Sequence, residues 1–504
     1  MRVAFHTLGC KVNHYETEAI KEAFVSRGAE IWGEDEAADV YVINTCTVTN
    51  IADRKSRQFI RRAKKTNPEA IIVVTGCYAQ VASDEVAGMP EVDLVIGNGH
   101  KSEICGLVME KLAARENKRA AAREEGPAAI VMPEDSSFAA SDHAAEKRQA
   151  AAGDTPEAET ADVLVTPRDS LTFYEDMGMV KSGSDDMSRA YIKIQDGCDR
   201  FCSYCLIPYA RGPVRSRPAG EIIEEVRNLV EAGFREVVLT GINTALYGTE
   251  PGAECTLSEL LTMLDELEIP GGKTIQAETA GGIPQPETDG SIDFRIRLSS
   301  LEPTVVDKDN VEEIIRHRRL CHHLHLSVQN GSDSVLKAMN RHYTREEYLD
   351  IVFMLRSHDP LFGITTDIIV GFPGETDKDF EDTLDIVKKA AFGRTHVFRY
   401  SPRKGTAGAA MKDAVPEQIK KDRAEVLESL GERAAKAFTG ANIGIAQTVL
   451  IEESREGYAT GYTGNYIKTY IEDPEGRIEA GKLYRAVLTR TFRDGALAVL
   501  NIND

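Results

Sequence analysis

Three cysteines in the segment 197–205 constrain this chain more than any other feature. Cys198, Cys202 and Cys205 form a C-x3-C-x2-C pattern directly after the predicted strand 190–195. Three thiolates at this spacing can hold three irons of a four-iron cluster and leave the fourth iron open, whereas a structural or electron-transfer cluster normally takes four cysteines. The pattern therefore predicts an iron–sulfur cluster with a chemical task.

Two plainer interpretations of these cysteines are a zinc knuckle and three unrelated core residues. Zinc would need a fourth Cys or His at short spacing, and neither follows Cys205. The histidines further downstream, His322, His323 and His325, are interpreted as ordinary barrel residues. The specificity of the spacing favours the cluster over both alternatives.

Length and composition set broad limits. A chain of 504 residues predicts two to four domains. The chain contains no run of about 18 apolar residues, and its first residues lack a signal core, so we expect a cytoplasmic protein without a membrane span. Its 9 cysteines, several of them beside glycine, suit a reducing compartment and metal binding better than disulfides.

The formal net charge of −21 argues at first against a nucleic-acid partner. Much of this charge lies in two segments that look like insertions, 111–186 and 266–293. Residues 111–186 are predicted to be an acidic Ala/Glu-rich linker, disordered in part, and residues 266–293 a surface insertion. The remaining surface is only mildly acidic, so local basic patches matter more than the sum.

Residues 1–110 alternate short apolar strands with amphipathic helices, which predicts an α/β domain with an open, mostly parallel sheet. Cys10, Cys46 and Cys77 each stand just after a predicted strand. Because the carboxyl ends of parallel strands converge on one crevice, we expect these cysteines to meet there. We predict a second three-cysteine cluster with an open iron, against the alternative of three small buried residues.

Two regions are candidates for RNA contact. A helix predicted over 53–65 has a basic face that is either simply solvated or contacts phosphate. Its candidate RNA-binding residues are Arg54, Arg57, Arg61 and Arg62. Residues 438–504 alternate with period two and predict a small all-β barrel, in which tyrosines mix with cations as in single-stranded RNA binders. Lys468 is its candidate contact, and a plain β module is the alternative.

Residues 187–430 again alternate strands and helices, which predicts a partial (βα)6 barrel. Small and polar residues follow the ends of successive strands, where the active site of such a barrel lies. Four of these residues are candidate cofactor contacts from their position alone: Gly241, Asn243, Gln329 and Asp367.

Longer stretches carry a family resemblance. The cysteine loop resembles the signature of the radical S-adenosylmethionine superfamily. The layout resembles its methylthiotransferases, with an N-terminal three-cysteine domain, a radical S-adenosylmethionine barrel and a TRAM-like RNA-binding barrel. Within that family the sequence is most similar to the enzymes that act on N6-threonylcarbamoyladenosine in tRNA. The matching segments are 7–13 (Thr-Leu-Gly-Cys-Lys-Val-Asn), 43–50, 195–198, 209–217 and 396–406.

The resemblance implies an activity and its cofactors. It implies two [4Fe-4S] clusters, one on each set of three cysteines, and two uses of S-adenosylmethionine, as the source of a 5′-deoxyadenosyl radical and as the methyl donor. The substrate it implies is N6-threonylcarbamoyladenosine at tRNA position 37, which gains a methylthio group at C2. The implied partners are an electron donor such as flavodoxin or ferredoxin and a sulfur donor. Candidates for contact with tRNA phosphate or a cofactor carboxylate are Arg211, Arg215 and Arg217.

Other activities stay open at this point. The same chemistry could act on isopentenyladenosine in tRNA or on an aspartate of a ribosomal protein. In a different class, the chain would be a non-catalytic iron–sulfur RNA-binding protein or an electron carrier, which would not cleave S-adenosylmethionine. A zinc or thiol–disulfide protein would purify colourless and free of iron.

Overall fold

The computed structural model describes residues 1–48, 50–124, 161–180, 188–269, 294–303 and 308–501. The greater part of the predicted surface insertion, residues 270–293, lies outside the described residues, as do residues 125–160 and 181–186 of the predicted linker. Within the described ranges, no helix is both long enough and apolar enough to cross a membrane.

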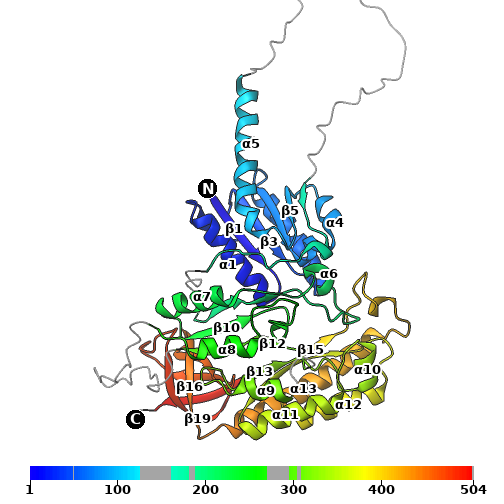
Figure 1. The fold of residues 1–504 in the computed structure, drawn as a ribbon, viewed down its shortest axis with the longest axis vertical. Helices are drawn as coiled ribbons and strands as arrows, with labels where there is room; N and C mark the ends of the chain where they lie inside the picture. The colour runs from blue at the N-terminus through cyan, green and yellow to red at the C-terminus, as the bar shows by residue number, and fades with distance from the viewer. Residues whose placement is uncertain (49, 125–160, 181–187, 270–293, 304–307, 502–504) are drawn as a thin grey trace, which may run out of the picture.

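The first domain is a parallel sheet with helices on both faces (Figure 1). Helices α1 (Lys11–Val25) and α5 (Ile104–Glu124) pack on one face, and α2 (Asn50–Thr66), α3 (Cys77–Val81) and α4 (Ser83–Ala87) on the other. The Val- and Ile-rich strands β3 and β4 are buried throughout, as expected for strands between two helical layers. The strands, in sheet order, are β2 (Glu30–Trp32), β1 (Arg2–Thr7), β3 (Val40–Thr45), β4 (Ile71–Gly76), β5 (Leu94–Ile96) and β6 (Asp162–Leu164).

Strand β6 comes from the segment that the sequence indicated as a linker. It pairs in parallel with β5, and the chain then crosses back over the domain, where Leu171 is buried and the Glu175 carboxylate accepts hydrogen bonds from the amide and hydroxyl of Ser102. A three-residue edge strand within an Ala- and Glu-rich stretch gives no clear period-two signal, which is why sequence reasoning missed it.

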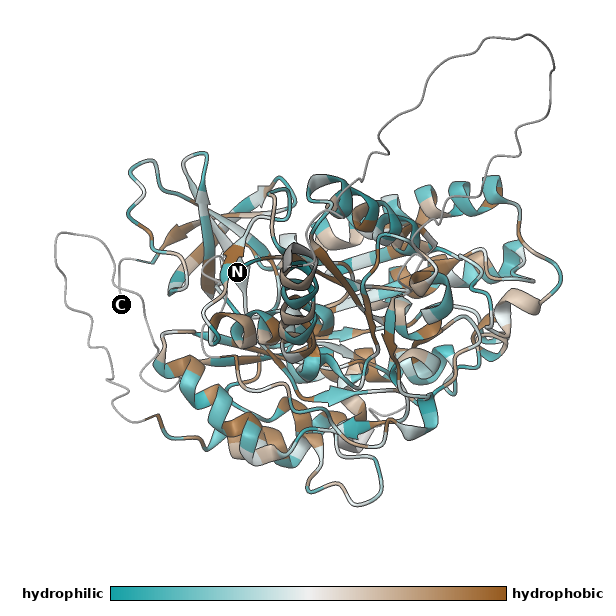
Figure 2. Ribbon diagram, turned by 90° about the horizontal axis from the view of Figure 1, so that it is seen from above, coloured by the Kyte–Doolittle hydropathy of each residue, from teal (hydrophilic) through white to brown (hydrophobic). Residues whose placement is uncertain are grey.

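The central domain confirms the predicted partial barrel. Its two parallel sheets continue one another, because β11 and β12 are separated only by Ser299. Figure 2 shows the apolar strands inside a shell of helices with polar outer faces. The strands are β7 (Ala190–Lys193), β10 (Glu236–Thr240), β11 (Arg295–Leu298), β12 (Ser300–Leu301), β13 (His323–Leu326), β14 (Gly363–Val370) and β15 (Arg394–Arg399).

Helices cover the outer face of this barrel. Three of them begin with a capping box, at Thr256, Thr344 and Thr376. In each box the threonine hydroxyl accepts from the amide three residues later, and the carboxylate of that later residue accepts from the threonine amide. These local signals explain where the chain begins these three helices. The main covering helices are α7 (Ala219–Glu231), α8 (Leu257–Asp265), α9 (Lys308–Ile315), α10 (Asp333–Ala338), α11 (Arg345–His358), α12 (Asp377–Ala390) and α13 (Glu417–Ala441).

The C-terminal segment forms the small all-β barrel that was predicted. Its strands close in the order β16–β17–β18–β20–β19, and it lies on the other side of the central domain from the first sheet (Figure 1). Their bounds are β16 (Ala446–Arg455), β17 (Tyr458–Thr463), β18 (Lys468–Glu472), β19 (Leu483–Phe492) and β20 (Gly495–Leu500).

A buried carboxylate joins this small barrel to the central domain. Glu236, at the start of β10, accepts hydrogen bonds from Arg295 at 2.6 Å and Arg297 at 2.8 Å and lies 3.3 Å from Arg189. The two β11 arginines also donate to backbone carbonyls of the small barrel at Thr448, Tyr462, Thr463 and Gly464. Burial alone would raise the pKa of Glu236, but the charges of the arginines outweigh it and hold that pKa well below its ordinary value.

We expect Glu236→Ala to lower the free energy of unfolding by about 3–5 kcal/mol, because the buried guanidiniums of Arg295 and Arg297 lose the carboxylate that they share. Since the folded pKa is depressed, this stabilisation is present above the unfolded pKa of about 4.3 and is lost as the pH falls through the folded pKa. Denaturant unfolding at several pH values measures both effects. Glu221→Gln, at a half-exposed carboxylate, is the control; a loss as large as that of Glu236→Ala would contradict the assignment.

Candidate functional site

The first cysteine triad, Cys198, Cys202 and Cys205, lies in a loop after β8 (Gln195–Asp196), at the carboxyl end of the first barrel strand. Gly197 begins this loop at φ +76°, and a Cβ there would lie 1.8 Å from the Pro213 carbonyl oxygen, so only glycine fits. Phe201 also adopts a left-handed conformation, at φ +48°. The loop therefore follows one tight path, along which Cys202 is near enough to raise the pKa of the Cys198 and Cys205 thiols.

The turn after α10 fastens this loop. The Asn340 side chain donates to the carbonyls of Arg200 and Phe201 at 3.2 and 3.1 Å, and the Ser203 hydroxyl donates to the Ala338 carbonyl. N–H groups also point at the sulfurs themselves. The Ile207 amide donates to Cys205 Sγ at 3.4 Å, and the Arg341 guanidinium donates to Cys202 Sγ at 3.4 Å.

The second cysteine triad consists of Cys10, Cys46 and Cys77, which follow the neighbouring strands β1, β3 and β4. Thr45 pairs with Gly76 in the sheet, so Cys46 and Cys77 leave it side by side. A Cβ at Gly9 would lie 3.2 Å from Cys46 Sγ, which places the Cys10 loop against Cys46. Cys46 and Cys77 are buried, and Cys10 is exposed.

Asn13 and Asn44 hold these strand ends in place. The Asn13 side chain donates to the carbonyls of Leu8 and Thr45 at 2.7 and 3.1 Å, and Asn44 donates to the Asn13 carbonyl at 2.9 Å. Both asparagines are fully buried. They belong to the segments that carried the family resemblance, but sequence reasoning gave them no role.

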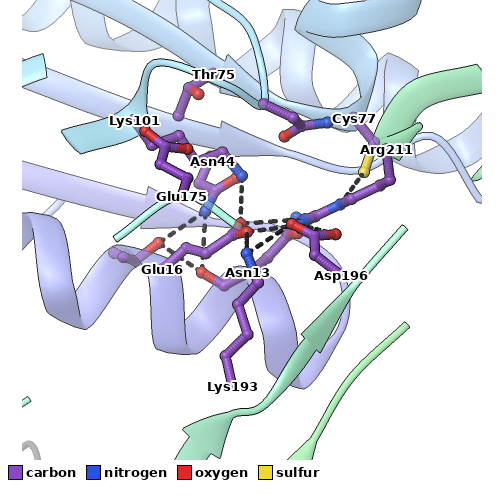
Figure 3. Close-up of polar contacts among 12 residues, drawn as sticks. Asn13, Glu16, Asn44, Thr75, Cys77, Lys101, Glu175, Lys193, Asp196 and Arg211 are labelled. Atoms are coloured by element: carbon purple, nitrogen blue, oxygen red, sulfur yellow. Dashed lines mark hydrogen bonds and ion pairs between the residues drawn. The ribbon is translucent and has the colours of Figure 1, made fainter. Parts of the chain in front are cut away.

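A buried network of charges connects the two triads (Figure 3). The Arg211 guanidinium, fully buried, donates to Cys77 Sγ at 3.3 Å, to Glu16 at 2.5 Å and to Asp196 at 3.2 Å. Asp196 in turn accepts from the Gly197 amide at 2.8 Å, one residue before Cys198. Lys193 joins both carboxylates, and Lys101 pairs with Glu16. The pKa of Glu16 is held well below its ordinary value: burial opposes this, and Arg211 and the two lysines outweigh the burial.

The donor set of both triads fits an iron–sulfur cluster. Burial, together with the charge of neighbouring Cys77 and Cys202, raises the pKa of the Cys46 and Cys198 thiols to about 12, so thiolates form there only with a strong cation to neutralise them. The groups that oppose this rise are N–H donors aimed at sulfur, the Val48 amide at Cys46 and the Arg200 amide at Cys198. Such donors are typical around cluster thiolates.

A single-ion site gains no support. Throughout the described ranges, no three Cys, His, Asp or Glu side chains form a group that could hold one metal ion. In a four-iron cluster each thiolate binds its own iron, so the sulfurs stand further apart than the ligands of one zinc ion. His323 and His325 lie on β13 inside the barrel and share the Thr365 hydroxyl, in keeping with their interpretation as barrel residues.

The structure corrects the prediction for three arginines. Arg211, Arg215 and Arg217 are buried, and their guanidiniums are occupied inside the protein, so they do not offer a surface to tRNA phosphate. Arg215 donates to the carbonyls of Leu171, Arg211 and Pro213, and Arg217 pairs with Glu225. Alternating arginines after a cysteine loop look alike in a sequence whether they face RNA or fix the junction of two domains.

The basic face of α2 is exposed in part. Arg54, Arg61 and Arg62 are exposed, while Arg57 donates to Tyr78 and Glu85. Arg62 pairs with Asp35, and Arg61 lies 3.9 Å from Glu91. In the C-terminal barrel Lys468 is half-buried and pairs with Asp494 at 3.1 Å. These residues remain candidates for RNA contact.

Three of the cofactor candidates, Gly241, Asn243 and Gln329, follow the carboxyl ends of barrel strands as the first triad does, whereas Asp367 lies within β14. Asn243 donates to Glu302 at 3.1 Å, and Glu302 also pairs with Arg341, the residue that contacts Cys202. A Cβ at Gly241 would lie 2.8 Å from Gln195, so close packing explains this glycine. Gln329 has a left-handed φ of +64° and pairs with β14, and Asp367 lies 3.3 Å from His325.

Comparison with known proteins gives two family matches and many relatives. The family described as Uncharacterized protein family UPF0004 matches residues 2–97, and the Radical SAM superfamily matches residues 192–387. The threonylcarbamoyladenosine tRNA methylthiotransferase MtaB of Bacillus subtilis is 37% identical over 492 residues, which cover 96% of this chain and 94% of that protein. Its namesake from Aquifex aeolicus is 37% identical, with 97% and 100% covered.

A relative with a different named product is more distant. The tRNA-2-methylthio-N(6)-dimethylallyladenosine synthase of Moorella thermoacetica is 32% identical, with 96% of this chain and 95% of that protein covered. Among solved structures, the radical S-adenosylmethionine methyltransferase TsrM from Kitasatospora setae has a TM-score of 0.50 at 14% identity, covering 79% of this chain and 72% of that chain. At that identity the likeness shows the fold alone.

Proposed function

The chain belongs to the radical S-adenosylmethionine methylthiotransferase family, with the threonylcarbamoyladenosine tRNA methylthiotransferases as relatives along its whole length, and we propose that it shares their reaction. It adds a methylthio group to C2 of N6-threonylcarbamoyladenosine at tRNA position 37. The observation that carries this proposal is the presence of two cysteine triads at strand ends, connected by the hydrogen bonds of Arg211 to Cys77 Sγ and to Asp196. A single triad would serve radical formation without a place for sulfur.

The two triads divide the work. An iron–sulfur cluster with S-adenosylmethionine would supply the radical chemistry typical of the superfamily, here directed at C2 of the adenine. We place this cluster on Cys198, Cys202 and Cys205 and a second, sulfur-presenting cluster on Cys10, Cys46 and Cys77. In the second triad the burial of Cys46 and Cys77 excludes water, the Asn13 and Asn44 hydrogen bonds hold the ends of β1 and β3 together, and the pairing of Thr45 with Gly76 holds β4 beside β3.

The substrate reaches both triads from the end of the barrel where its strands terminate. Asn243 and Gly241 are the proposed contacts for the cofactor beside the first triad, with Gln329 and Asp367 further around the barrel. The exposed cations of α2, Arg54, Arg61 and Arg62, are the proposed phosphate-binding face. The proposed partners are an electron donor such as flavodoxin or ferredoxin and a sulfur donor.

The proposal is tested by mass spectrometry of nucleosides from bulk tRNA of cells with and without this gene. We expect 2-methylthio-N6-threonylcarbamoyladenosine to disappear in its absence and the unthiolated precursor to accumulate. Re-expression of the wild-type gene is the control. Loss of a methylthio derivative of isopentenyladenosine instead would move the substrate to the other tRNA branch of the family, and an unchanged nucleoside profile would remove tRNA as the substrate.

A further inference from the structure

Each cysteine triad has one buried guanidinium on one of its sulfurs. Arg211 Nε donates to Cys77 Sγ at 3.3 Å, and Arg341 Nη1 donates to Cys202 Sγ at 3.4 Å. The Arg211 side chain is 0% exposed and that of Arg341 is 6% exposed. The two arginines come from different elements, one after the first cysteine loop and one after α10. The same arrangement has therefore been built twice, from unrelated parts of the chain.

Arg211 is fixed on its far side. Its Nη1 group donates to Glu16 at 2.5 Å and to Asp196 at 3.2 Å, and its Nη2 group donates to Asn13 at 2.6 Å (Figure 3). Since Asn13 also holds the strand ends of the triad, the guanidinium and Cys77 belong to one rigid unit. The guanidinium cannot turn away from the sulfur without breaking these buried hydrogen bonds.

Arg341 is fixed in a parallel way. Its Nη1 group pairs with Glu302 at 3.1 Å, its Nη2 group donates to the Ser327 carbonyl at 3.2 Å, and its guanidinium lies over the Tyr343 ring at 5.1 Å. Glu302 also accepts a hydrogen bond from the Asn243 side chain. Arg341 therefore shares this carboxylate with Asn243, a residue just after the carboxyl end of β10. The surroundings of the two arginines thus differ in charge: two carboxylates and two lysines surround Arg211, and Glu302 is the carboxylate paired with Arg341.

Hydrogen bonds to ligating sulfurs and nearby charges set the reduction potential of an iron–sulfur cluster. An N–H donor withdraws electron density from the thiolate, and a buried cation favours the state with one more electron. A guanidinium does both when it points at sulfur, and its hydrogen bond acts only on the cluster whose sulfur it reaches. A lysine at the same place would keep the charge and lose the fixed planar fork.

We propose that Arg211 and Arg341 are positioning residues that set the reduction potentials of two separate iron–sulfur clusters, each through its N–H···S hydrogen bond. The inference rests on the proposed function, in that each triad binds a cluster. It goes further in assigning each cluster its own tuning residue, so that the potential for radical formation and the potential for sulfur transfer are adjusted independently.

The test is a redox titration, followed by electron paramagnetic resonance, of full-length protein reconstituted with iron and sulfide without oxygen. Triple Cys→Ala variants of either triad assign the two signals. We expect Arg211→Lys to shift the midpoint potential of the second-triad cluster to a more negative value and to leave the other in place. Arg341→Lys does the reverse. Arg217→Lys, a buried arginine six positions away that pairs with Glu225 and no sulfur, shifts neither.

Iron content and circular dichroism separate the outcomes. One outcome is that the wild type binds both clusters and that Arg211→Lys has the same two midpoint potentials as the control Arg217→Lys. In that case the inference is wrong and the proposed function stands. Iron for a single cluster in the wild type would overturn both. Should Arg211→Lys lose its fold, the neutral double variant Glu16→Gln, Arg211→Gln removes the buried charge pair together, and an unshifted potential there overturns the inference.

Discussion

Replacing Cys198 with alanine reduces the formation of 5′-deoxyadenosine from S-adenosylmethionine to the level measured without enzyme. The first triad supplies only three thiolates, which would hold three irons of the cluster and leave the fourth open. Without one of these thiolates, the site no longer holds a four-iron cluster. The effect is all-or-none because no other cysteine follows nearby to replace the ligand. The measurement is liquid chromatography of the products after reduction with dithionite.

Cys255→Ala provides the matched control for this first prediction. Cys255 lies in the same domain, half-buried against Tyr247 and outside both triads, so its loss should leave 5′-deoxyadenosine formation within about twofold of wild type. Equal yields from wild type and Cys198→Ala would remove Cys198 from the ligand set. A fall in both variants would point to a general loss of folding.

The second large effect is expected from Cys10→Ala, which should retain 5′-deoxyadenosine formation and lose the methylthio product altogether. The reason is spatial separation. Cys10 belongs to the strand ends of the first sheet, and the first triad is held by the barrel and by the turn at Asn340. Removing one thiolate of the second triad therefore leaves the radical-forming loop intact. Both products are measured in one reaction with tRNA that carries N6-threonylcarbamoyladenosine.

Cys105→Ala is the control in the same domain. Cys105 lies on the buried face of α5, where its thiol donates to the Ala23 carbonyl, and it contacts no triad sulfur in the structure. It should form both products. If Cys10→Ala forms the methylthio product at the wild-type rate, the second triad does not present the sulfur.

The sequence predicted the architecture well because its signals are local. Val- and Ile-rich strands that alternate with amphipathic helices predicted two α/β domains. Alternation of apolar and polar residues with period two predicted the small barrel. Strands of three residues at a sheet edge, β2 and β6, carry too little pattern to detect, and β6 lies within a stretch of linker-like composition. The six triad cysteines were predicted from spacing and strand ends alone, and their role as cluster ligands stays a prediction.

The parts that sequence reasoning missed depend on long-range pairing. Glu16, Lys101, Lys193 and Asp196 meet in one network although Glu16 and Lys193 stand 177 positions apart. A buried charge on an otherwise apolar helix face is the one signal that could have marked Glu16 in advance. Arg211 was taken for a phosphate contact because a sequence does not reveal whether a guanidinium meets solvent or a carboxylate from another domain.

Iron and sulfide analysis with Mössbauer spectroscopy of the anaerobically reconstituted protein tests the central claim, two clusters on two triads, most directly. The account predicts about eight irons per chain in the wild type and about four in each triple Cys→Ala variant, all in four-iron clusters. About four irons in the wild type, unchanged when Cys10, Cys46 and Cys77 are replaced together, would contradict it.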